Sequence, residues 1–395
     1  MIEDPVVIVG ASRTPLGGFG GDLSPLSAPE LGAVAISDAI TKSGIKITDV
    51  NEVIMGVVLP AGQGQAPARQ ASIGAGIPKA VGATTINKMC GSGMKATMLA
   101  HDNILSGSHE IMVAGGMESM SNAPYLLPDA RSGMRMGHGQ LKDHMFIDGL
   151  EDAYDKGTLM GVYAENTAEA YQFTRDAQDE FSITSLKRAL LASENGYFSD
   201  EIVPITVQSR KAETVIKSDE QPRNARPEKI PELKPAFREH GTVTAANSSS
   251  ISDGAAALIL VRRSEAEKQG LTPLAAILGH ATHAQDPEWF TTAPIEAINK
   301  VLEKASWNKD EVDLFEINEA FAVVTMAAMK DLGLSHDKVN VHGGACALGH
   351  PVGATGARII VTLLHALSRY DLKKGVASLC IGGGEATAIA IERLN

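Results

Sequence analysis

The sequence predicts an α/β protein made of two similar halves with mostly parallel strands and an irregular region between them. Short apolar segments alternate with helix-like segments over most of the 395 residues, which is typical of α/β units. Matching segments recur in the second half at an offset of 260–267 residues, which indicates an internal repeat. Residues 121–248 lack this alternation. The chain also exceeds the size at which one hydrophobic core usually stops growing.

The elements of the repeat pair up in chain order. In each half a helix-like segment leads to a strand. In the first half the helix-like segment 31–43 leads to the strand 53–59, and in the second half 294–305 leads to 312–318. A turn at Cys90 then opens a helix that precedes the apolar segment 111–118, and a turn at His350 opens a helix that precedes 377–385. The corresponding strands therefore carry Gly-Gly motifs followed by Glu118 and Glu385.

The middle region has its own features. Residues 174–196 are predicted to form a helix, with Thr174 as the N-cap and Gly196 as the stop. Residues 205–238 hold eight Lys or Arg against five Asp or Glu. This positive balance would suit a ligand with several phosphates, although a solvated surface is the default explanation for such a run.

Composition excludes several classes of protein. The net charge of −12 argues against general nucleic-acid binding. Three cysteines without a C-x-x-C pair cannot build a disulfide framework, so a reducing, cytoplasmic setting is expected. The N-terminus MIEDPVVIVG lacks a basic region, and no run of about 18 apolar residues occurs, so neither a signal peptide nor a membrane span is expected.

Three glycine-rich turns carry residues suited to acyl chemistry. In NKMCGSGMKA, residues 87–96, Cys90 lies where a helix should begin, and the helix start should bias its thiol toward the nucleophilic thiolate. His350, in GHPVGATG, could accept the thiol proton, and Cys380, in CIGGG, is a second thiol. Each residue alone could serve packing, since most free cysteines are small buried hydrophobes. The set of three is harder to explain by packing.

These blocks resemble the motifs of the thiolase family. The resemblance rests on NKMCGSG, NEAFA at 318–322, GHPVGATG and CIGGG, supported by VVIVGASRTPLGGFGG, GGMESMSNAPY and TVTAANSSSISDGAAA. It runs from residue 6 to the C-terminus, and Gly91-Ser92 is similar to the short-chain, acetyl-transferring members. The resemblance implies reversible Claisen condensation of two acetyl-CoA to acetoacetyl-CoA plus CoA. The alternative is a 3-ketoacyl-CoA thiolase of broader chain length or of 2-methyl-branched substrates.

The resemblance also implies a fold and a domain division. The thiolase fold has two similar α/β halves in a layered αβαβα core with an inserted loop domain. The boundaries expected here are 1–120 plus 249–270 for the first half, 121–248 for the loop domain that binds CoA and makes oligomer contacts, and 271–395 for the second half.

Catalytic roles follow by the same resemblance. Cys90 would become acylated, His350 would activate it, and Cys380 would remove the α-proton of the second acetyl-CoA. One oxyanion hole would be formed by His350 and a water held by Asn318. The other would be formed by the backbone N–H groups of Cys90 and Gly382. Without the resemblance, Asn318 would be taken for a turn residue at a strand end.

Substrate-binding residues are expected around the loop domain. Ser249 and Ala245, in TAANSSS, match positions near the pantetheine, and Arg223 is aligned near the adenine. Leu159-Met160 replaces the His-Met of many short-chain members, which makes the pocket more apolar. Phe290 resembles members that accept a 2-methyl branch. Cys346 is expected to serve packing.

Rival functions and the expected partners complete the prediction. A dinucleotide-binding enzyme is disfavoured because no G-x-G-x-x-G occurs. A decarboxylating ketoacyl synthase would have another residue in place of Cys380, and a non-catalytic lipid-binding relative would lack a catalytic group.

The expected partners are acetyl-CoA, acetoacetyl-CoA and CoA, in a homotetramer built as a dimer of dimers, with no nucleic acid and no membrane. Neither a metal nor a cofactor is expected beyond CoA thioesters as substrates, and a monovalent cation is left open.

Overall fold

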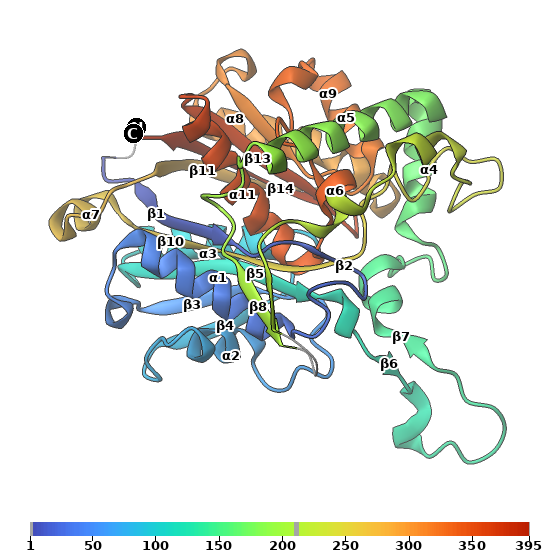
Figure 1. The fold of residues 1–395 in the computed structure, drawn as a ribbon, viewed down its shortest axis with the longest axis horizontal. Helices are drawn as coiled ribbons and strands as arrows, with labels where there is room; N and C mark the ends of the chain where they lie inside the picture. The colour runs from blue at the N-terminus through green and yellow to red at the C-terminus, as the bar shows by residue number, and fades with distance from the viewer. Residues whose placement is uncertain (1–2, 209–212, 395) are drawn as a thin grey trace.

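A large mixed sheet organises the molecule (Figure 1). The computed structural model describes residues 3–208 and 213–394. Within them the strands follow the order β12-β13-β14-β11-β1-β10-β5-β3-β4, with β2 beside β10. Their bounds are β1 Val6–Arg13, β2 Gly17–Gly18, β3 Glu52–Gly56, β4 Gly82–Ile86, β5 Ile111–Ser119, β10 Ser252–Arg262, β11 Ala275–Ala284, β12 Leu314–Ile317, β13 Lys374–Ile381 and β14 Glu385–Arg393.

The strand order repeats, which confirms the two similar halves. From the outside inward, β3, β5, β10 and β1 of the first half correspond to β12, β13, β14 and β11 of the second. Pairing is parallel between β3 and β5 and between β12 and β13, and antiparallel at the next two steps in both halves. The halves join where β1 pairs with β11 through Val7–Ala276 and Ile8–Ala275. The internal repeat seen in the sequence is therefore structural.

The prediction of mostly parallel strands is wrong. Parallel pairing joins β3 to β4 and β5, and β12 to β13, whereas the pairings among β13, β14, β11, β1, β10 and β5 are antiparallel. Between β13 and β14 the physical reason is the length of the connection, because a parallel crossover needs a dozen or more residues. Only Gly382–Gly384 separate β13 from β14. Gly384 has φ +87° and a Cβ there would lie 2.2 Å from the Gln285 carbonyl oxygen, so this turn requires glycine.

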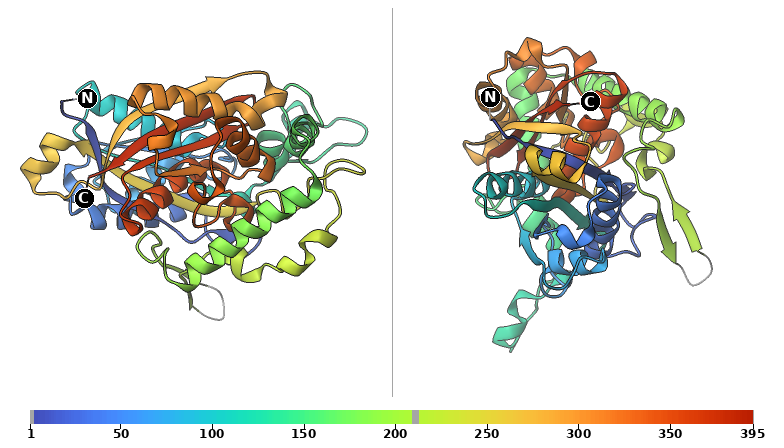
Figure 2. Two further views of the ribbon diagram at one scale, coloured as in Figure 1. Left: turned by 90° about the horizontal axis from the view of Figure 1, so that it is seen from above. Right: turned by 90° about the vertical axis from the view of Figure 1, so that its left-hand side faces the viewer.

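Helices form three layers around the two halves of the sheet. One outer layer, α1 and α2, packs on the first half, and another, α8 and α9, belongs to the second half. Helices α3 and α11 contact each other and strands of both halves, so they lie between them (Figures 1 and 2). Their bounds are α1 Ala28–Ser43, α2 Pro67–Gly74, α3 Ser92–Leu105, α8 Ala293–Ala305, α9 Ala322–Leu332 and α11 Val352–Arg369. This is the layered αβαβα core that the resemblance implies.

The two central helices approach closely because glycines face the contact. A Cβ on Gly93 would lie 2.7 Å from the backbone nitrogen of Ala357, and one on Gly356 would lie 2.3 Å from that of Met94. Such distances leave no room for any other residue. Since Gly93 is the second residue of α3 and Gly356 the fifth residue of α11, the two helices are in close contact near their N-termini.

The region between β5 and β10 covers one edge of the core. It holds α4 Met160–Tyr171, α5 Arg175–Glu194, α6 Glu220–Asn224 and the two small hairpins β6 Tyr125–Leu126 with β7 Lys142–Asp143, and β8 Ile205–Gln208 with β9 Glu213–Ile216. The predicted helix is confirmed as α5, and Thr174 caps it by accepting the Ala177 N–H at 3.2 Å. Of the positive segment, residues 209–212 lie outside the described part.

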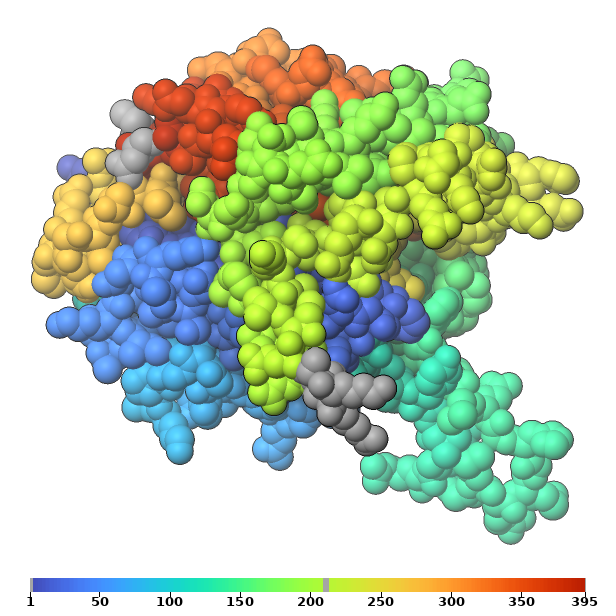
Figure 3. Space-filling model, in the orientation of Figure 1, coloured from blue at the N-terminus to red at the C-terminus, as the bar shows by residue number. Residues whose placement is uncertain are grey.

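An arm formed by residues 125–143 projects away from the core (Figures 1 and 3). Its exposed side chains include Tyr125, Leu127, Met134, Met136 and Leu141. Two further short α-helices of the described residues are α7 Arg263–Gln269 after β10 and α10 Ala345–Leu348 before α11. Among the described residues, no helix combines the length and apolar character that crossing a bilayer would require.

Candidate active site

Cys90 lies in the turn between β4 and α3, two residues before the helix starts, as predicted. The hydroxyl of Ser92 holds this turn by accepting the Lys88 N–H at 2.9 Å and donating to the Met89 carbonyl at 2.6 Å. Met89 takes a positive φ of 47°, which is uncommon for a residue with a side chain. The strained turn therefore presents Cys90 at the start of α3 in one fixed conformation.

The predicted bias of Cys90 toward thiolate is wrong for the free protein. Burial raises its pKa to about 11 and the charge of Glu118 adds to this, although the backbone N–H groups of Gly382 and Cys90 lower it. The helix start and these amides lower the Cys90 pKa by less than the loss of water raises it. The neutral thiol is therefore favoured over the thiolate in the free protein.

His350 is buried in the turn before α11, and its hydrogen bonds reveal its tautomer. Its Nδ1 lies 2.6 Å from the Thr355 hydroxyl, which donates to the Pro351 carbonyl at 2.9 Å. Because the only proton of that hydroxyl is committed, His350 Nδ1 carries the hydrogen and donates. Nε2 then holds a free lone pair, and it has no partner among the described residues. Burial, with a smaller effect of Arg358, lowers the pKa of His350 to about 3, so the imidazole is a neutral base.

The Cys90 and His350 turns meet at the same end of the central helices. Val352 is buried in a cluster against which Cys90 packs. The carboxylate of Glu118 ties the surroundings together by accepting the Gly353 and Val58 N–H groups, both at 2.9 Å. Burial raises the Glu118 pKa to about 7. Sequence reasoning recognised Glu118 as part of the repeat but missed its place beside the site.

Cys380 and Gly382 come to Cys90 from the β13–β14 turn. The Gly382 N–H lies within hydrogen-bonding reach of the Cys90 sulfur, and Cys380 is close enough for the two thiols to influence each other's ionisation. Burial raises the pKa of Cys380 well above its usual value. An ion pair between Lys88 and Glu385 joins the two turns from outside. The structure therefore assembles two thiols and one backbone donor at a single point.

Asn318 lies at the end of β12, next to the strand that carries Cys380. Its N–H donates to the Ser378 carbonyl at 3.0 Å. Its side chain is buried, and within the described residues neither Oδ1 nor Nδ2 has a hydrogen-bond partner. An unsatisfied buried amide costs about 1–3 kcal/mol, so this side chain is poised to hold a water or a ligand.

An apolar wall surrounds Cys380. Phe290 is buried there with its ring 6.5 Å from that of Tyr163 and 6.4 Å from that of Phe321, measured between centroids. Met160, the first residue of α4, packs against the same cluster, and its sulfur would lie 3.4 Å from a Cβ on Gly382. Leu159 is the N-cap residue of α4.

A cavity of about 310 Å³ opens beside the site. Its lining includes Ser182, Leu186, Gln221, Asn224, Arg226, Lys229, Leu233, Ala245, Ala246, Ser250, Cys346 and Ala347. The Ser250 carbonyl accepts the His350 N–H at 3.2 Å, which connects the cavity to the turn that carries His350. Ala245 lines the cavity. Half-buried Ser249, one residue before Ser250, donates its N–H to the Ala320 carbonyl at 2.9 Å.

Two residues singled out in the sequence lie at the margin of this cavity or outside it. Arg223 does not line the cavity and pairs instead with Asp22. Arg226 and Lys229, which sequence reasoning missed, supply its positive charge. The positive balance of residues 205–238 was the signal that could have found them. The Cys346 thiol donates a hydrogen bond to the Glu319 carbonyl, with 3.7 Å between sulfur and oxygen, and Cys346 also lines the cavity.

Comparison with known proteins gives a consistent result over the whole chain. Residues 6–264 match the family described as "Thiolase, N-terminal domain" and residues 271–393 match "Thiolase, C-terminal domain". An acetyl-CoA acetyltransferase of Cupriavidus necator is 52% identical, with 98% of this chain and 99% of the relative covered. A probable acetyl-CoA acetyltransferase of Dictyostelium discoideum is 48% identical, with coverages of 99% and 94%.

Two solved structures are also similar. The acetyl-CoA acetyltransferase of Bacillus anthracis superposes with a TM-score of 0.96 at 45% identity, covering 99% of both chains. A thiolase from Ascaris suum in complex with coenzyme A superposes with a TM-score of 0.93 at 44% identity, covering 99% of this chain and all of that one.

Proposed function

The chain belongs to the thiolase family, and on that premise we propose that it is an acetyl-CoA acetyltransferase. It joins two acetyl-CoA molecules into acetoacetyl-CoA and CoA, and it catalyses the reverse thiolysis. The observation that carries this proposal is the meeting of the Cys90 thiol with the Gly382 N–H and the Cys380 thiol. The names of the full-length relatives support an acetyl group as substrate.

In the first half-reaction Cys90 attacks the thioester carbonyl of acetyl-CoA. The neutral thiol gives its proton to His350 Nε2, whose lone pair is free because Nδ1–H is committed to Thr355. The C–S bond to CoA then breaks and leaves acetyl-Cys90. Cys380, held as a thiol by burial, protonates the departing CoA thiolate and becomes a thiolate itself.

In the second half-reaction Cys380 acts as the base. Its thiolate removes a proton from the methyl group of a second acetyl-CoA, and the resulting carbanion attacks the carbonyl of acetyl-Cys90. A new C–C bond forms, the bond to the Cys90 sulfur breaks, and the thiolate takes back the proton stored on His350. Acetoacetyl-CoA leaves, and both thiols are protonated again, so the cycle is closed.

Two groups of donors stabilise the oxyanions. The N–H groups of Cys90 and Gly382 lie next to the Cys90 sulfur and are proposed to bind the oxygen of acetyl-Cys90. Asn318, with no side-chain partner among the described residues, is proposed to hold a water that binds the enolate together with protonated His350. Losing one such donor typically costs on the order of 3 kcal/mol of transition-state stabilisation.

The cavity beside Ser250 is proposed to hold coenzyme A. Arg226 and Lys229 supply positive charge for phosphates, while Ala245 and Leu233 supply apolar contact for the pantetheine. Ser249 and Ala245 keep the binding roles expected of them, whereas Arg226 takes the role expected of Arg223. The loop domain at 121–248 carries most of this site, between halves at 1–120 plus 249–270 and at 271–395.

Thiolysis tests the activity directly. The protein is mixed with acetoacetyl-CoA and CoA, and loss of the enolate absorbance is followed, with Cys90→Ala as the inactive variant. We expect turnover by the wild type only. Wild-type inactivity, or full activity in Cys90→Ala, would overturn the proposal.

The acyl preference is tested by substrate comparison. Met160 and Phe290 belong to the apolar wall around Cys380, so we expect acetoacetyl-CoA to be preferred over longer 3-ketoacyl-CoA esters. The ratio of kcat/KM for 2-methylacetoacetyl-CoA and acetoacetyl-CoA measures tolerance of a branch. A Phe290→Met variant shows whether the aromatic ring sets that ratio.

We also propose a homotetramer, a dimer of dimers, working in lipid metabolism in the cytoplasm. The apolar side chains on the projecting arm at 125–143 support further association, since large exposed apolar groups mark interaction sites. Light scattering of the purified protein, with and without a Met136→Asp substitution, measures the assembly. A monomeric wild type would contradict the tetramer.

A further inference from the structure

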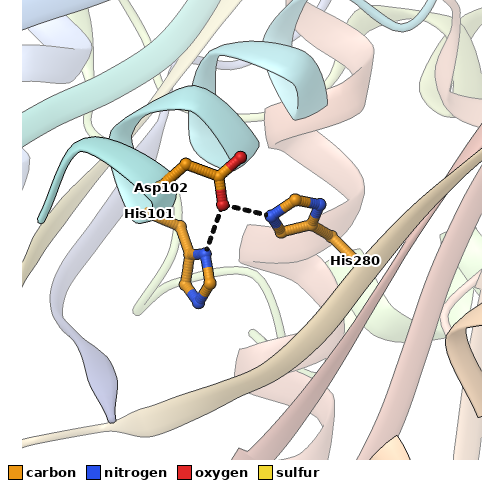
Figure 4. A group of neighbouring side chains, drawn as sticks. All are labelled: His101, Asp102 and His280. Atoms are coloured by element: carbon orange, nitrogen blue, oxygen red, sulfur yellow. Dashed lines mark hydrogen bonds and ion pairs between the residues drawn. The ribbon is translucent and has the colours of Figure 1, made fainter. Parts of the chain in front are cut away.

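We propose that His101, Asp102 and His280 form a binding site for a divalent transition metal of the zinc type, outside the catalytic centre (Figure 4). The sequence predicted no metal site, because His101 and Asp102 are adjacent and His280 lies 178 residues from Asp102. Only the fold brings the three side chains together.

The ligand atoms converge on one point. His101 Nδ1 lies 3.1 Å and His280 Nε2 lies 2.8 Å from the same oxygen of Asp102. The candidate ligand atoms of all three side chains lie within 4.8 Å of one another. Two imidazole nitrogens and one carboxylate oxygen form a donor set that zinc commonly takes in proteins, and its usual bonds of about 2.0–2.2 Å place neighbouring ligands a little over 3 Å apart.

The side chains differ in exposure in a way that suits metal entry. His101 is buried and His280 is mostly buried, whereas half of the Asp102 side chain is exposed. The two imidazole rings stand nearly perpendicular, at 88° with centroids 5.0 Å apart. Buried histidines can hold a metal in place, and the exposed carboxylate leaves a side through which the ion and a water ligand can enter.

The protonation states are compatible with coordination. Burial lowers the pKa of His101 and keeps it neutral, which is the form that binds metals. The hydrogen bonds to histidine hold the pKa of Asp102 below its usual value despite burial. Each histidine donates an N–H to Asp102 in the metal-free protein. On binding, that hydrogen moves to the other ring nitrogen and the freed lone pair coordinates the ion.

Two cations lie near the site and would weaken it. Arg262 donates to the Ile104 and Leu105 carbonyls and influences the ionisation of His101, and Lys304 Nζ donates to the His280 carbonyl at 2.8 Å. Both cations use their donors on backbone oxygens, so neither takes a ligand atom of the site.

The ion would join the two halves of the molecule. His101 and Asp102 belong to α3 of the first half, and His280 belongs to β11 of the second. Nine helical residues separate Ser92 from His101, which places the site about 14 Å along α3 from the catalytic turn. A metal here would cross-link the halves without touching the chemistry at Cys90.

Metal titration of the purified, metal-free protein tests the proposal. Cobalt chloride serves as a spectroscopic probe and zinc chloride as the competing ion. We expect one equivalent of cobalt per chain, with visible bands of nitrogen and oxygen ligation, without the charge-transfer band of a cobalt thiolate, and with displacement by zinc. The absence of that thiolate band separates this site from the two thiols of the catalytic centre.

Matched variants assign the ligands. His280→Ala and Asp102→Asn should each fail to bind the one equivalent of cobalt. His283→Ala, on the same strand as His280 but outside the cluster, should still bind it. Zinc should raise the Tm of the wild type and of His283→Ala but not that of His280→Ala, and thiolysis should be unchanged in all three variants. The proposal would be overturned if the wild type bound no cobalt or if its spectrum showed a cobalt thiolate band. It would also be overturned if both His280→Ala and Asp102→Asn still bound one equivalent of cobalt. These outcomes are independent of whether the protein is a thiolase.

Discussion

The two halves of the molecule share a strand order but differ in one connection. This connection follows β5 in the first half and the corresponding strand β13 in the second half. After β5 the first half leaves the core for the region that carries α4, α5 and the cavity, and it returns only at β10. After β13 the second half turns through Gly382–Gly384 into β14. The long excursion carries most residues of the cavity, and the short turn follows Cys380 and carries the Gly382 backbone donor.

The turns before α3 and α11 also occupy corresponding places in the two halves but carry different side chains. Each places a reactive residue two positions before a central helix, Cys90 in one half and His350 in the other. Burial acts on both, but it raises the pKa of the thiol and lowers that of the imidazole. Burial therefore favours the neutral form of both side chains in the free protein.

The largest expected effect separates the two thiols. Cys90→Ala should lose both half-reactions, with activity reduced about 10⁴-fold or more because the nucleophile is absent. Cys380→Ser should still form acetyl-Cys90 slowly but fail to condense it, because a serine hydroxyl is too weak an acid and base. Mass spectrometry of protein incubated with acetyl-CoA measures the acetyl group. Equal loss of acetylation in both variants would contradict separate roles.

A smaller effect is expected from Thr355, which positions His350. Thr355→Val removes the acceptor of the Nδ1–H group, so the reactive tautomer is no longer favoured and kcat should fall about 10-fold, or about 1.4 kcal/mol. KM for CoA should stay unchanged because Thr355 does not line the cavity. Thr355→Ser keeps the hydroxyl and should restore kcat. A change confined to KM would exclude this positioning role.

The ionisation of Cys90 gives a third test. With a pKa near 11, the thiolate fraction rises tenfold per pH unit throughout the range below it. Iodoacetamide labelling of Cys90 should therefore accelerate about 100-fold between pH 7 and pH 9 without levelling off. Peptide mass spectrometry after timed labelling measures the rate. A plateau by pH 8 would indicate that a thiolate already exists in the free protein.

The smallest effect is expected at the ion pair between Lys88 and Glu385, which joins the turns of the two halves. Both side chains are partly exposed, so each single replacement, Lys88→Glu or Glu385→Lys, should cost about 1 kcal/mol of unfolding free energy or less. The double exchange should recover most of that loss. Urea unfolding measures the free energies, and additive losses in the double variant would show that the contact does not stabilise the protein.

Much of this protein was determined by its sequence alone. The repeat at a nearly constant offset predicted two similar halves because helices and strands follow the local apolar pattern. The turns at Cys90 and His350 were predicted to open helices, and both do. Thr174 was predicted to cap α5 because an N-cap needs only a local hydroxyl, and it does. These features depend on neighbours in the chain, so they can be read without the fold.

Other features were decided only by the tertiary structure. The antiparallel pairing of β14 and the neutral state of Cys90 depend on what packs around them, and both differ from the prediction. The roles of Arg226 beside the cavity and of Glu118 beside Cys90 were not found from sequence spacing. The cluster of His101 with His280 joins residues far apart in the chain. The physical reason is that ionisation and ligand geometry depend on burial and on contacts between distant segments, which a local pattern does not contain.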